Sequence, residues 1–463
     1  MTDRIAFTLN GAPCQLPPGT WPGQTLLEWL RGPEAGLCGT KEGCAEGDCG
    51  ACTVVLEEPD GRRVPLNSCL ALLGQMQGRA IRTVEGLRGA DGGAHPVQQA
   101  MAEGDATQCG FCTPGIVMSA WAHAREGGDV HDALAGNLCR CTGYRPIVDA
   151  FAHMADDGVA PPPPLPAAGH FAAPGQDFLA PGSLAELLAL RAAHPAAWLL
   201  AGGTDLGLRV SEHRERPAAI LSLGAVPELQ RLQADAAGLR IGAAVTYGRL
   251  LPALDGGFAP LAGLLRRLGS RQIRGMGTLG GNLGTASPIG DALPPLLALE
   301  AEIVLASAAR GERRVAASAF FTGYRQTLLR PDEVITRIDL PRPPPGAWLA
   351  CDKLSKRHDQ DISTVSTALL LRVQDGRIAE ARLAFGGMAA TPARAPAAEA
   401  ALRGAPLEEA SFRRAAEALA TDFTPLSDWR GSAAYRMAGA QGLLRRLYWR
   451  AARPELALEV HAP

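Results

Sequence analysis

The chain has 463 residues, enough for about three domains at roughly 150 residues each. Its 45 Lys and Arg residues against 47 Asp and Glu give a formal charge of −2, which excludes the strongly basic field typical of nucleic-acid-binding proteins. Apolar residues make up 47% and charged residues 20%, as in ordinary globular proteins, and no apolar run reaches the roughly 18 residues of a membrane span.

The chain start lacks the charged segment and long apolar stretch of a secretory signal, so we expect a cytoplasmic protein without membrane contact. In that reducing compartment, eleven cysteines favour metal ligands or catalytic thiols over disulfides. Ten of them lie before residue 142. The sequence therefore predicts N-terminal metal chemistry.

The N-terminal part of the chain predicts two small domains. Residues 1–85 have the pattern of an α+β domain, with a helix at 25–30 and strands at 5–9, 14–16, 53–57, 63–66 and 80–84. Residues 86–156 have a helical period, and Pro114 stands where a helix can begin.

A Pro-rich stretch at 157–175 predicts a linker between these domains and the rest of the chain. Residues 176–345 then alternate between helical and strand patterns, with a helix at 184–190 and strands at 198–201 and 239–244. A second Pro cluster ends this domain. Residues 346–463 open with strands at 368–373 and 381–385 and end in helix, which predicts a C-terminal α+β domain.

The first cysteine set has the spacing C-x4-C-x2-C followed, after sixteen residues, by one more cysteine: Cys44, Cys49, Cys52 and Cys69. This is the plant-type spacing for a [2Fe–2S] cluster. Glycines in the loop permit close approach of the backbone to the cluster sulfides. The alternative is zinc, which usually takes two C-x2-C arms. Cys38 lies near enough to compete as a ligand, but its position makes it a bystander.

The second set has the pattern C-x2-C, twenty-six residues, then C-x-C: Cys109, Cys112, Cys139 and Cys141. Cys112 stands at a predicted helix start, where the helix dipole stabilises a thiolate. Arg140 and Arg145 add positive charge nearby, or form exposed ion pairs. Spacing alone leaves zinc and a second [2Fe–2S] cluster open.

Both cysteine segments resemble those of the molybdenum hydroxylases, the xanthine dehydrogenase and aldehyde oxidase family. The resemblance rests on QCGFCTPG and NLCRCTGYRPI around the second set and on GCxxGxCGxC around the first, with Ala45 where glycine is commoner. It implies a plant-type ferredoxin (β-grasp) domain, a four-helix-bundle domain, and one [2Fe–2S] cluster in each. Cys14 and Cys351 match no ligand position.

Two glycine-rich segments, 199–206 and 275–291, offer backbone amides for an anion or form ordinary tight turns. The second contains a literal G-x-G-x-x-G beginning at Gly275. We reject a Rossmann site there, because that motif needs a strand before it and a helix after it, whereas we expect a basic helix followed by coil.

Both segments also resemble the family's FAD-binding domain, which has the vanillyl-alcohol-oxidase-like fold. The resemblance implies that one group of residues wraps the FAD diphosphate: Leu200, Ala201, Gly202, Gly203, Thr204 and Asp205. It implies further flavin contacts from Thr278, Gly281, Asn282, Thr285, Asp291, Ile335 and Lys353. Asp361 would line the nicotinamide approach. A lone lysine such as Lys353 is otherwise usually a solvated surface charge.

The resemblance implies an electron-transfer subunit. We expect no catalytic residue for substrate hydroxylation on this chain, and a molybdopterin-binding large subunit as its partner, in a heterotetramer of two small and two large chains. Electrons would run from molybdenum through two [2Fe–2S] clusters to FAD and then to NAD+, with xanthine or hypoxanthine as the substrate that is oxidised to urate. The alternatives are an aldehyde or another N-heterocycle as substrate, a free-standing NADH-dependent reductase, and a zinc-stabilised interaction protein.

Overall fold

A computed structural model describes residues 4–89, 92–152, 154–456 and 458. The short segments outside these ranges fall within the first two predicted domains and at the end of the last. The chain divides into two compact units. The first comprises residues up to Gln230 together with Thr246–Gly248 and Gly269–Gly281, and the second comprises the remainder.

The first unit begins with a five-stranded sheet in the order β2-β1-β5-β3-β4, in which β1 and β5 run parallel. Its strands are β1 (Ala6–Leu9), β2 (Ala12–Gln15), β3 (Thr53–Glu57), β4 (Arg63–Asn67) and β5 (Ala80–Arg82). Helix α1 (Leu26–Arg31) begins at Thr25, whose side chain and that of Glu28 form a capping box. The expected strands and helix are thus confirmed, with ends shifted by up to two residues.

Four helices follow: α2 (Pro96–Glu103), α3 (Thr113–Glu126), α4 (Val130–Leu134) and α5 (Arg145–Phe151). Helix α3 carries Pro114 in its first turn, as predicted, where the missing N–H costs no hydrogen bond. Its buried face centres on Trp121.

A second sheet of the first unit has the order β6-β7-β9-β8. Its strands are β6 (Gly169–Ala173), β7 (Gln176–Ala180), β8 (Trp198–Leu200) and β9 (Ala219–Ser222), and β6 takes up the end of the Pro-rich stretch. Helices α6 (Leu184–Ala193), α7 (Leu206–Ser211) and α10 (Arg271–Met276) also belong to this unit.

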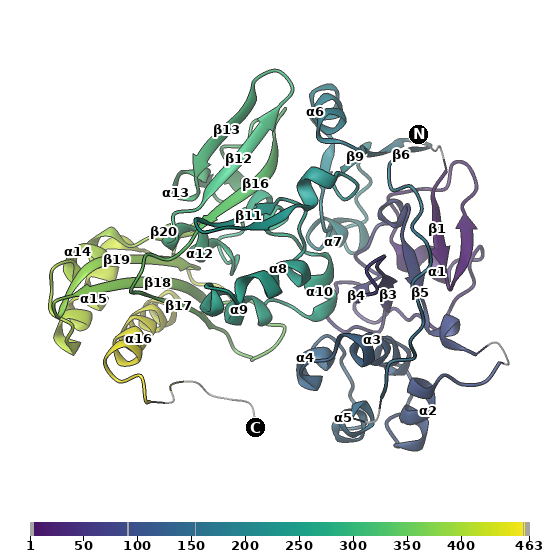
Figure 1. Cartoon of the computed structure of the whole chain (residues 1–463), viewed down its shortest axis with the longest axis horizontal. Helices are drawn as coiled ribbons and strands as arrows, with labels where there is room; N and C mark the ends of the chain where they lie inside the picture. Colours follow the sequence, from purple (N-terminus) through teal and green to yellow (C-terminus); the bar gives the residue numbers. More distant parts are fainter. Residues whose placement is uncertain (1–3, 90–91, 153, 457, 459–463) are drawn as a thin grey trace. The chain divides into compact units, whose positions relative to one another are not determined.

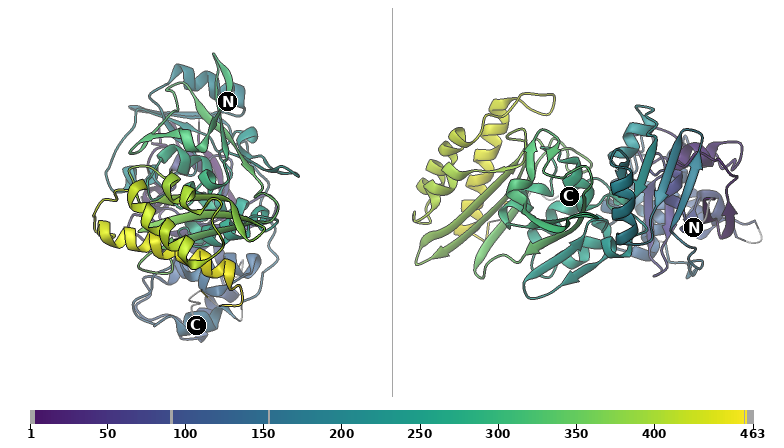
Figure 2. Two further views of the ribbon diagram at one scale, coloured as in Figure 1. Left: turned by 90° about the vertical axis from the view of Figure 1, so that its left-hand side faces the viewer. Right: turned by 90° about the horizontal axis from the view of Figure 1, so that it is seen from above.

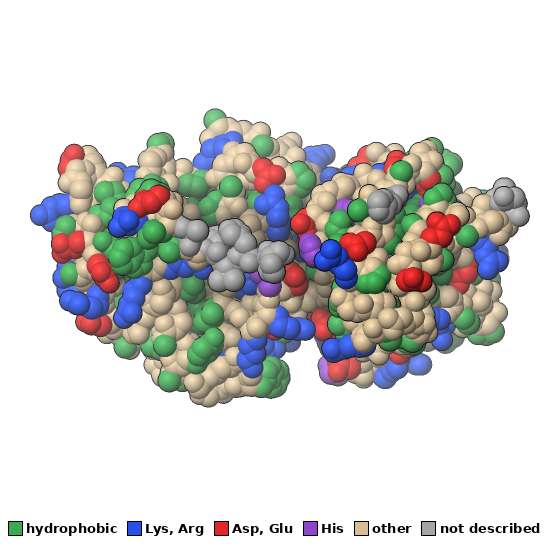
Figure 3. Space-filling view, turned by 90° about the horizontal axis from the view of Figure 1, so that it is seen from below, with side chains coloured by type: hydrophobic (Ala, Val, Ile, Leu, Met, Phe, Trp, Pro, Cys, Tyr) green, Lys and Arg blue, Asp and Glu red, His purple; other side chains and the backbone are tan. Residues whose placement is uncertain are grey.

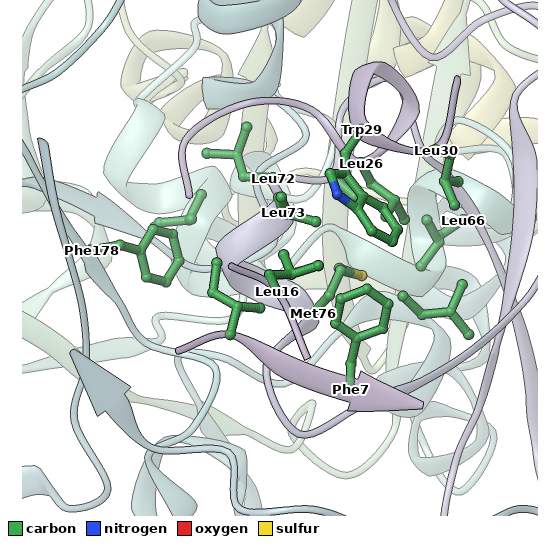
Figure 4. Close-up of a cluster of buried hydrophobic side chains, with 14 of the residues drawn as sticks. Phe7, Leu16, Leu26, Trp29, Leu30, Leu66, Leu72, Leu73, Met76 and Phe178 are labelled. Atoms are coloured by element: carbon green, nitrogen blue, oxygen red, sulfur yellow. The ribbon is translucent and has the colours of Figure 1, made fainter. Parts of the chain in front are cut away.

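The two sheets of the first unit share one hydrophobic core. Phe178 of β7 lies in the same buried cluster as Phe7, Leu26 and Trp29 of the N-terminal sheet (Figure 4). Leu73 and Met76, in a 3-10 turn at Leu73–Met76, lie in the cluster between them. This shared core fixes the N-terminal sheet against the strand that precedes the first glycine-rich segment.

The second unit contains a sheet in the order β10-β11-β16-β12-β13 and a sheet in the order β17-β18-β19-β20 (Figure 1). The first is built from β10 (Leu232–Ala234), β11 (Gly238–Gly242), β12 (Glu302–Ser307), β13 (Gly311–Ala316) and β16 (Val334–Pro341). The second is built from β17 (Ala347–Leu354), β18 (Val365–Gln374), β19 (Arg377–Gly386) and β20 (Ala393–Arg394). A small hairpin pairs β14 (Phe321–Gly323) with β15 (Gln326–Thr327).

Helices cover the last sheet on both faces. α12 (Leu293–Ala298) packs on β18 and β19, and α14 (Pro396–Leu402), α15 (Glu409–Asp422) and α16 (Ala433–Ala452) form the outer layer seen in Figure 2. The remaining helices are α8 (Tyr247–Leu254), α9 (Ala259–Arg266), α11 (Leu279–Thr285) and α13 (Ala317–Phe320).

Charges of both signs are interspersed on the face drawn in Figure 3, in keeping with the small net charge. Within the described ranges, no helix combines the length and the hydropathy needed to cross a lipid bilayer.

Candidate functional site

The first cysteine set lies in the loop between α1 and β3 and just after β4, and its four thiols come together in two pairs. Cys52 and Cys69 are buried, with their Sγ atoms 3.3 Å apart. Cys44 and Cys49 form the other pair, joined by a hydrogen bond between their side chains. In each pair one thiol donates and the other accepts.

Backbone amides converge on Cys44. The amides of Glu46, Asp48 and Cys49 donate to its Sγ at 3.5, 3.4 and 3.3 Å. The hydrogen bond from the Cys49 thiol, followed by these amides, lowers the pKa of Cys44 to about 5. The loop thus stabilises a thiolate at neutral pH, which is the form that binds iron.

The curvature that aims these amides requires left-handed backbone at three positions: φ is +61° at Ala45, +82° at Gly47 and +67° at Gly50. The side-chain amide of Asn67 adds a donor on the other pair, 3.8 Å from the Sγ of Cys52. The thiol of Cys69 and that donor lower the pKa of Cys52.

The second set is also paired. A side-chain hydrogen bond joins Cys109 to Cys141, and another joins Cys112, at the start of α3, to Cys139. Burial raises the pKa of Cys139, but hydrogen bonds from Thr142, Cys141 and Cys112 together lower it by more. The hydroxyl of Tyr144 accepts from the Cys139 amide at 2.8 Å, which fixes the loop before α5.

Exposure distinguishes the members of the second set. Cys139 is buried, whereas Cys109 and Cys141 are exposed, as are the neighbouring side chains of Phe111 and Leu138. One edge of this set therefore reaches the surface of the first unit.

The pairing fits the geometry of a two-iron cluster, in which each iron takes two thiolates. A single zinc ion would instead gather four ligands around one point. Among the described residues, no group of three or more His, Cys, Asp or Glu side chains could hold a single metal ion. The donor chemistry and the two-plus-two arrangement fit a [2Fe–2S] cluster in each set.

Three cysteines lie apart from these pairs. Cys14 lies on β2 and Cys351 on β17, and burial raises the pKa of both thiols. Cys38 lies exposed in the loop that precedes the first set. Their assignment as bystanders stays a prediction.

The first glycine-rich segment lies between β8 and α7, and the structure brings it against the turn after α10. A Cβ atom on Gly202 would stand 2.0 Å from the carbonyl oxygen of Met276, so only glycine permits this backbone contact. The side chain of Gln75 donates to the carbonyl of Ala201 at 3.2 Å. Gln75 thereby ties this turn to the N-terminal domain.

The predicted diphosphate residues are therefore held together within the first unit. Leu200 ends β8, and Ala201, Gly202, Gly203, Thr204 and Asp205 form the turn that leads into α7. In the neighbouring turn, the hydroxyl of Thr278 accepts from the amide of Gly281 at 2.9 Å.

The segment 275–291 differs from expectation at one point. Residues expected to be coil form helix α11, although they include three glycines. Rejection of a Rossmann site still holds, because helix α10, and not a strand, precedes the segment.

Within the second unit, Lys353 and Asp291 form a buried ion pair. Lys353 Nζ donates to Asp291 Oδ2 at 2.9 Å, and Ser363 Oγ donates to the other carboxylate oxygen at 2.5 Å. Asn282 and Thr285 lie on α11, and Ile335 lies buried on β16. The Oδ1 atom of Asn282 is buried without a hydrogen-bond partner among the described residues, as expected of a group that contacts a ligand.

The side chain of Asp361 forms hydrogen bonds within the loop in which it lies. Its carboxylate accepts from the amides of Lys356 and Arg357 at 2.6 and 2.9 Å. Burial raises its pKa, but these two amides together with the positive charges of Arg357 and Lys353 lower it by more, so that the net shift in pKa is downward. The carboxylate is thus committed to shaping the loop, and its predicted role in nicotinamide approach stays a prediction.

Several residues that contact these sites were not predicted from the sequence: Asn67, Gln75, Asn137 and Gln272. All are neutral amides. Asn137 opens the NLCRCTGYRPI segment, which is a signal in the sequence, whereas nothing in the surroundings of Gln75 and Gln272 distinguishes them from surface residues. Only the fold reveals that each contacts a predicted cofactor loop.

Comparison with known proteins identifies three domains. The family profile described as "FAD binding domain in molybdopterin dehydrogenase" matches residues 171–343. The profile described as "[2Fe-2S] binding domain" matches residues 83–152, and that described as "CO dehydrogenase flavoprotein C-terminal domain" matches residues 351–451.

Curated relatives include xanthine dehydrogenases from Drosophila subobscura and Emericella nidulans. Each is 34% identical to this chain, over 92% and 96% of its length. The chain spans 37% and 38% of those relatives, a little over a third of their length.

Similar solved structures include carbon monoxide dehydrogenase from Hydrogenophaga pseudoflava, at 31% identity and a TM-score of 0.56, covering 58% of this chain and 94% of that one. Quinoline 2-oxidoreductase from Pseudomonas putida 86 is 30% identical, with a TM-score of 0.55, covering 60% of this chain and 96% of the other.

Proposed function

Since the chain belongs to the molybdenum hydroxylase family and carries its [2Fe–2S] and FAD-binding domains, we propose that it relays electrons between a molybdenum centre on a partner chain and NAD+. When bound, two [2Fe–2S] clusters would carry single electrons, and FAD would collect two and transfer them as hydride. The observation that carries this proposal is the direct contact between the two cysteine loops: the amide of Leu138 donates to the carbonyl of Cys49 at 2.9 Å.

The second set is the proposed entry point. Cys109 and Cys141 are exposed beside the apolar side chains of Phe111 and Leu138, which suits a face that a molybdopterin-binding chain covers. A heterotetramer of two such pairs is our proposed assembly.

The first set is the proposed link to the flavin. Cys69 is followed by Leu70, whose carbonyl oxygen would lie 2.3 Å from a Cβ atom on Gly207, in the first turn of α7. The side chain of Gln75 donates to the carbonyl of Ala201 in the predicted diphosphate turn. The segment that follows Cys69 therefore contacts both the predicted diphosphate turn and the helix after it, within one unit.

One predicted flavin contact, Lys353, is charged. Lys353 brings a positive charge that would stabilise anionic, reduced flavin, and Asp291 and Ser363 hold that charge in place. We propose β-grasp, helical-bundle and vanillyl-alcohol-oxidase-like folds for the three cofactor domains, with the boundaries 1–85, 86–156 and 176–345.

We propose xanthine or hypoxanthine as the substrate of the assembled enzyme, on the strength of the xanthine dehydrogenases among the relatives. An aldehyde or another N-heterocycle is the second candidate, since a quinoline oxidoreductase is among the similar structures.

Purification of the native complex tests the proposal. We expect a brown protein with iron and FAD that copurifies with a molybdenum-containing chain and reduces NAD+ with xanthine. A protein that oxidises NADH but never copurifies with such a chain would instead be a free-standing reductase. A colourless protein with zinc and no iron or flavin would refute the electron-transfer role altogether.

A further inference from the structure

Helix α10 comes from the FAD-binding part of the sequence but lies against both iron–sulfur loops. Arg271 Nε donates to Asp132 Oδ2 at 2.7 Å, and Arg274 Nη2 donates to Asp132 Oδ1 at 2.5 Å, which fixes the helix to α4. Ile273 packs against the buried group that contains Cys52 and Cys69. All of these residues belong to the first unit.

Gln272 of this helix is fully buried between the two loops. Its Nε2 atom lies 3.1 Å from Asn137 Oδ1, 3.2 Å from Ser119 Oγ and 3.2 Å from Thr53 Oγ1. Ser119 also donates to Asn137 Oδ1 at 2.6 Å. The side-chain amide of Gln272 therefore holds the side chain of Asn137. Asn137 lies two residues before Cys139, a member of the second set.

Asn137 in turn holds the first set. Its Nδ2 atom donates to the carbonyl of Gly50 at 3.1 Å, next to the bond between Leu138 N and Cys49 O. One route between ligands of the two sets thus runs from Cys49 across a single hydrogen bond to Leu138 and on to Cys139.

The backbones are close enough here that glycine is required. A Cβ atom on Gly50 would stand 1.9 Å from the carbonyl oxygen of Gly136, and one on Gly136 would stand 2.1 Å from Gln272 Oε1. Oε1 itself is buried without a hydrogen-bond partner among the described residues. Burying a carbonyl oxygen without a hydrogen-bond partner costs free energy. A glutamine at this position is therefore explained by what its Nε2 group does.

We propose that Gln272 is the positioning residue of an electron junction between the two clusters, a proposal that rests on the proposed function. It keeps Asn137 in place, and Asn137 keeps the Leu138–Cys49 hydrogen bond closed. With both clusters bound, that contact would carry a single electron from the second set to the first, with no change in protons or covalent bonds. Loss of Gln272 would let the hydrogen bond between Leu138 and Cys49 open. Electron transfer would then slow, because tunnelling across open space is slower than through a bonded contact.

The test uses the full chain loaded with both clusters and FAD. In Gln272→Met, which keeps the side-chain length and removes the amide, we expect inter-cluster transfer to slow at least about tenfold, since small displacements of reacting groups cost large factors in rate. The rate is followed by photoreduction and rapid-freeze electron paramagnetic resonance. The magnetic interaction between the two reduced clusters should weaken as well, whereas iron content and both midpoint potentials should stay unchanged, because Gln272 contributes no hydrogen bond to a cysteine sulfur.

Arg271→Met is the matched control, because it loosens the same helix from Asp132 and leaves the Gln272–Asn137 contact in place. Equal slowing in both variants would show that α10 merely holds the loops, and would overturn the proposal. If Gln272→Met fails to retain both clusters, Ser119→Ala serves as the second variant, because it removes one hydrogen-bond partner of Asn137. We expect it to slow inter-cluster transfer by a smaller factor. An unchanged rate in Ser119→Ala would also overturn the proposal. A wild-type protein that shows only one cluster signal refutes the proposed function, whereas two clusters with normal transfer in Gln272→Met refute only the role of Gln272.

Discussion

The ammonium group of Lys353 donates to Asp291 at 2.9 Å, and both side chains are almost completely buried. Ser363 and the carbonyl of Arg267 complete this arrangement, at 2.5 Å from Asp291 and 3.3 Å from Lys353. A charge buried this deeply is tolerated only when it is paired, so the two residues depend on each other.

The first prediction follows from this pair. Asp291→Asn should leave the ammonium uncompensated and destabilise the surrounding strands by about 3 kcal/mol or more. Faster amide hydrogen exchange in β17 and β18 would report the loss. The double variant Asp291→Asn with Lys353→Met should recover most of the protection, and a double variant as labile as the single one would contradict the pairing argument.

Replacing one cysteine of each set should remove one cluster at a time. Cys69→Ser and Cys112→Ser should each lower the iron content by about half, because each set holds one two-iron cluster. Electron paramagnetic resonance should then show a single and different remaining signal in each variant. Cys38→Ser is the control, and we expect full iron content there because its thiol lies outside both pairs.

Ala45 offers a stability test of the first loop. Its φ of +61° lies in the left-handed region, which a side chain disfavours by about 1 kcal/mol, whereas glycine adopts it freely. We therefore expect Ala45→Gly to stabilise the loop by about 0.5–1 kcal/mol and to slow cluster loss in denaturant. Ala51→Gly, at a buried position without a positive φ, should destabilise it; the same sign in both variants would contradict the argument.

The half-buried carboxylate of Asp157 predicts a pH dependence of stability. Burial raises the pKa of this group, but hydrogen bonds from Trp121, Val159, Arg63 and His95 lower it by more, to well below its usual range. Trp121 Nε1 donates at 2.7 Å, and Arg63 stacks on the same indole ring, 3.7 Å from its centroid. Because the folded pKa lies below the unfolded value of about 3.9, the contribution is complete above that value and is lost as the pH falls.

Asp157→Asn should therefore cost about 2–3 kcal/mol of unfolding free energy at pH 7. The cost should stay constant down to about pH 5 and begin to shrink below about pH 4, as seen by chemical denaturation. Asp156→Asn, at a more exposed neighbour, should cost clearly less. A penalty for Asp157→Asn that grows toward acid pH would show that the carboxylate is not the stabilising form.

The cysteine pattern predicts more of the site than any other feature of the sequence. A cluster loop needs fixed spacing and glycine at defined points, so the spacing by itself groups Cys44, Cys49 and Cys52. The pairing within each set does not follow from spacing, because Cys52 meets Cys69 only after β3 and β4 form their hairpin.

The contact between Gln272 and Asn137 could not be predicted from the sequence, although Asn137 opens the NLCRCTGYRPI segment. Gln272 is 135 positions away from Asn137 in the sequence. The residues that flank a glutamine in the sequence do not tell whether its side chain is buried or exposed. Helix α11 escapes prediction for a related reason: glycine weakens the helical signal locally, and in this fold tertiary contacts outweigh that propensity.

Gly202 gives the most direct test of the flavin turn. A methyl group there would stand 2.0 Å from the carbonyl oxygen and 2.6 Å from the carbonyl carbon of Met276, and no rotamer change relieves a clash with backbone. Gly202→Ala should therefore move the predicted diphosphate turn and raise the Kd for FAD at least about tenfold, or about 1.4 kcal/mol. Both clusters should remain, since the cysteine pairs do not depend on this turn. Gly263→Ala, on α9 with open space around its Cα, is the matched control and should bind FAD normally. FAD titration followed by flavin fluorescence measures both variants, and unchanged affinity in Gly202→Ala would mean that the diphosphate binds elsewhere.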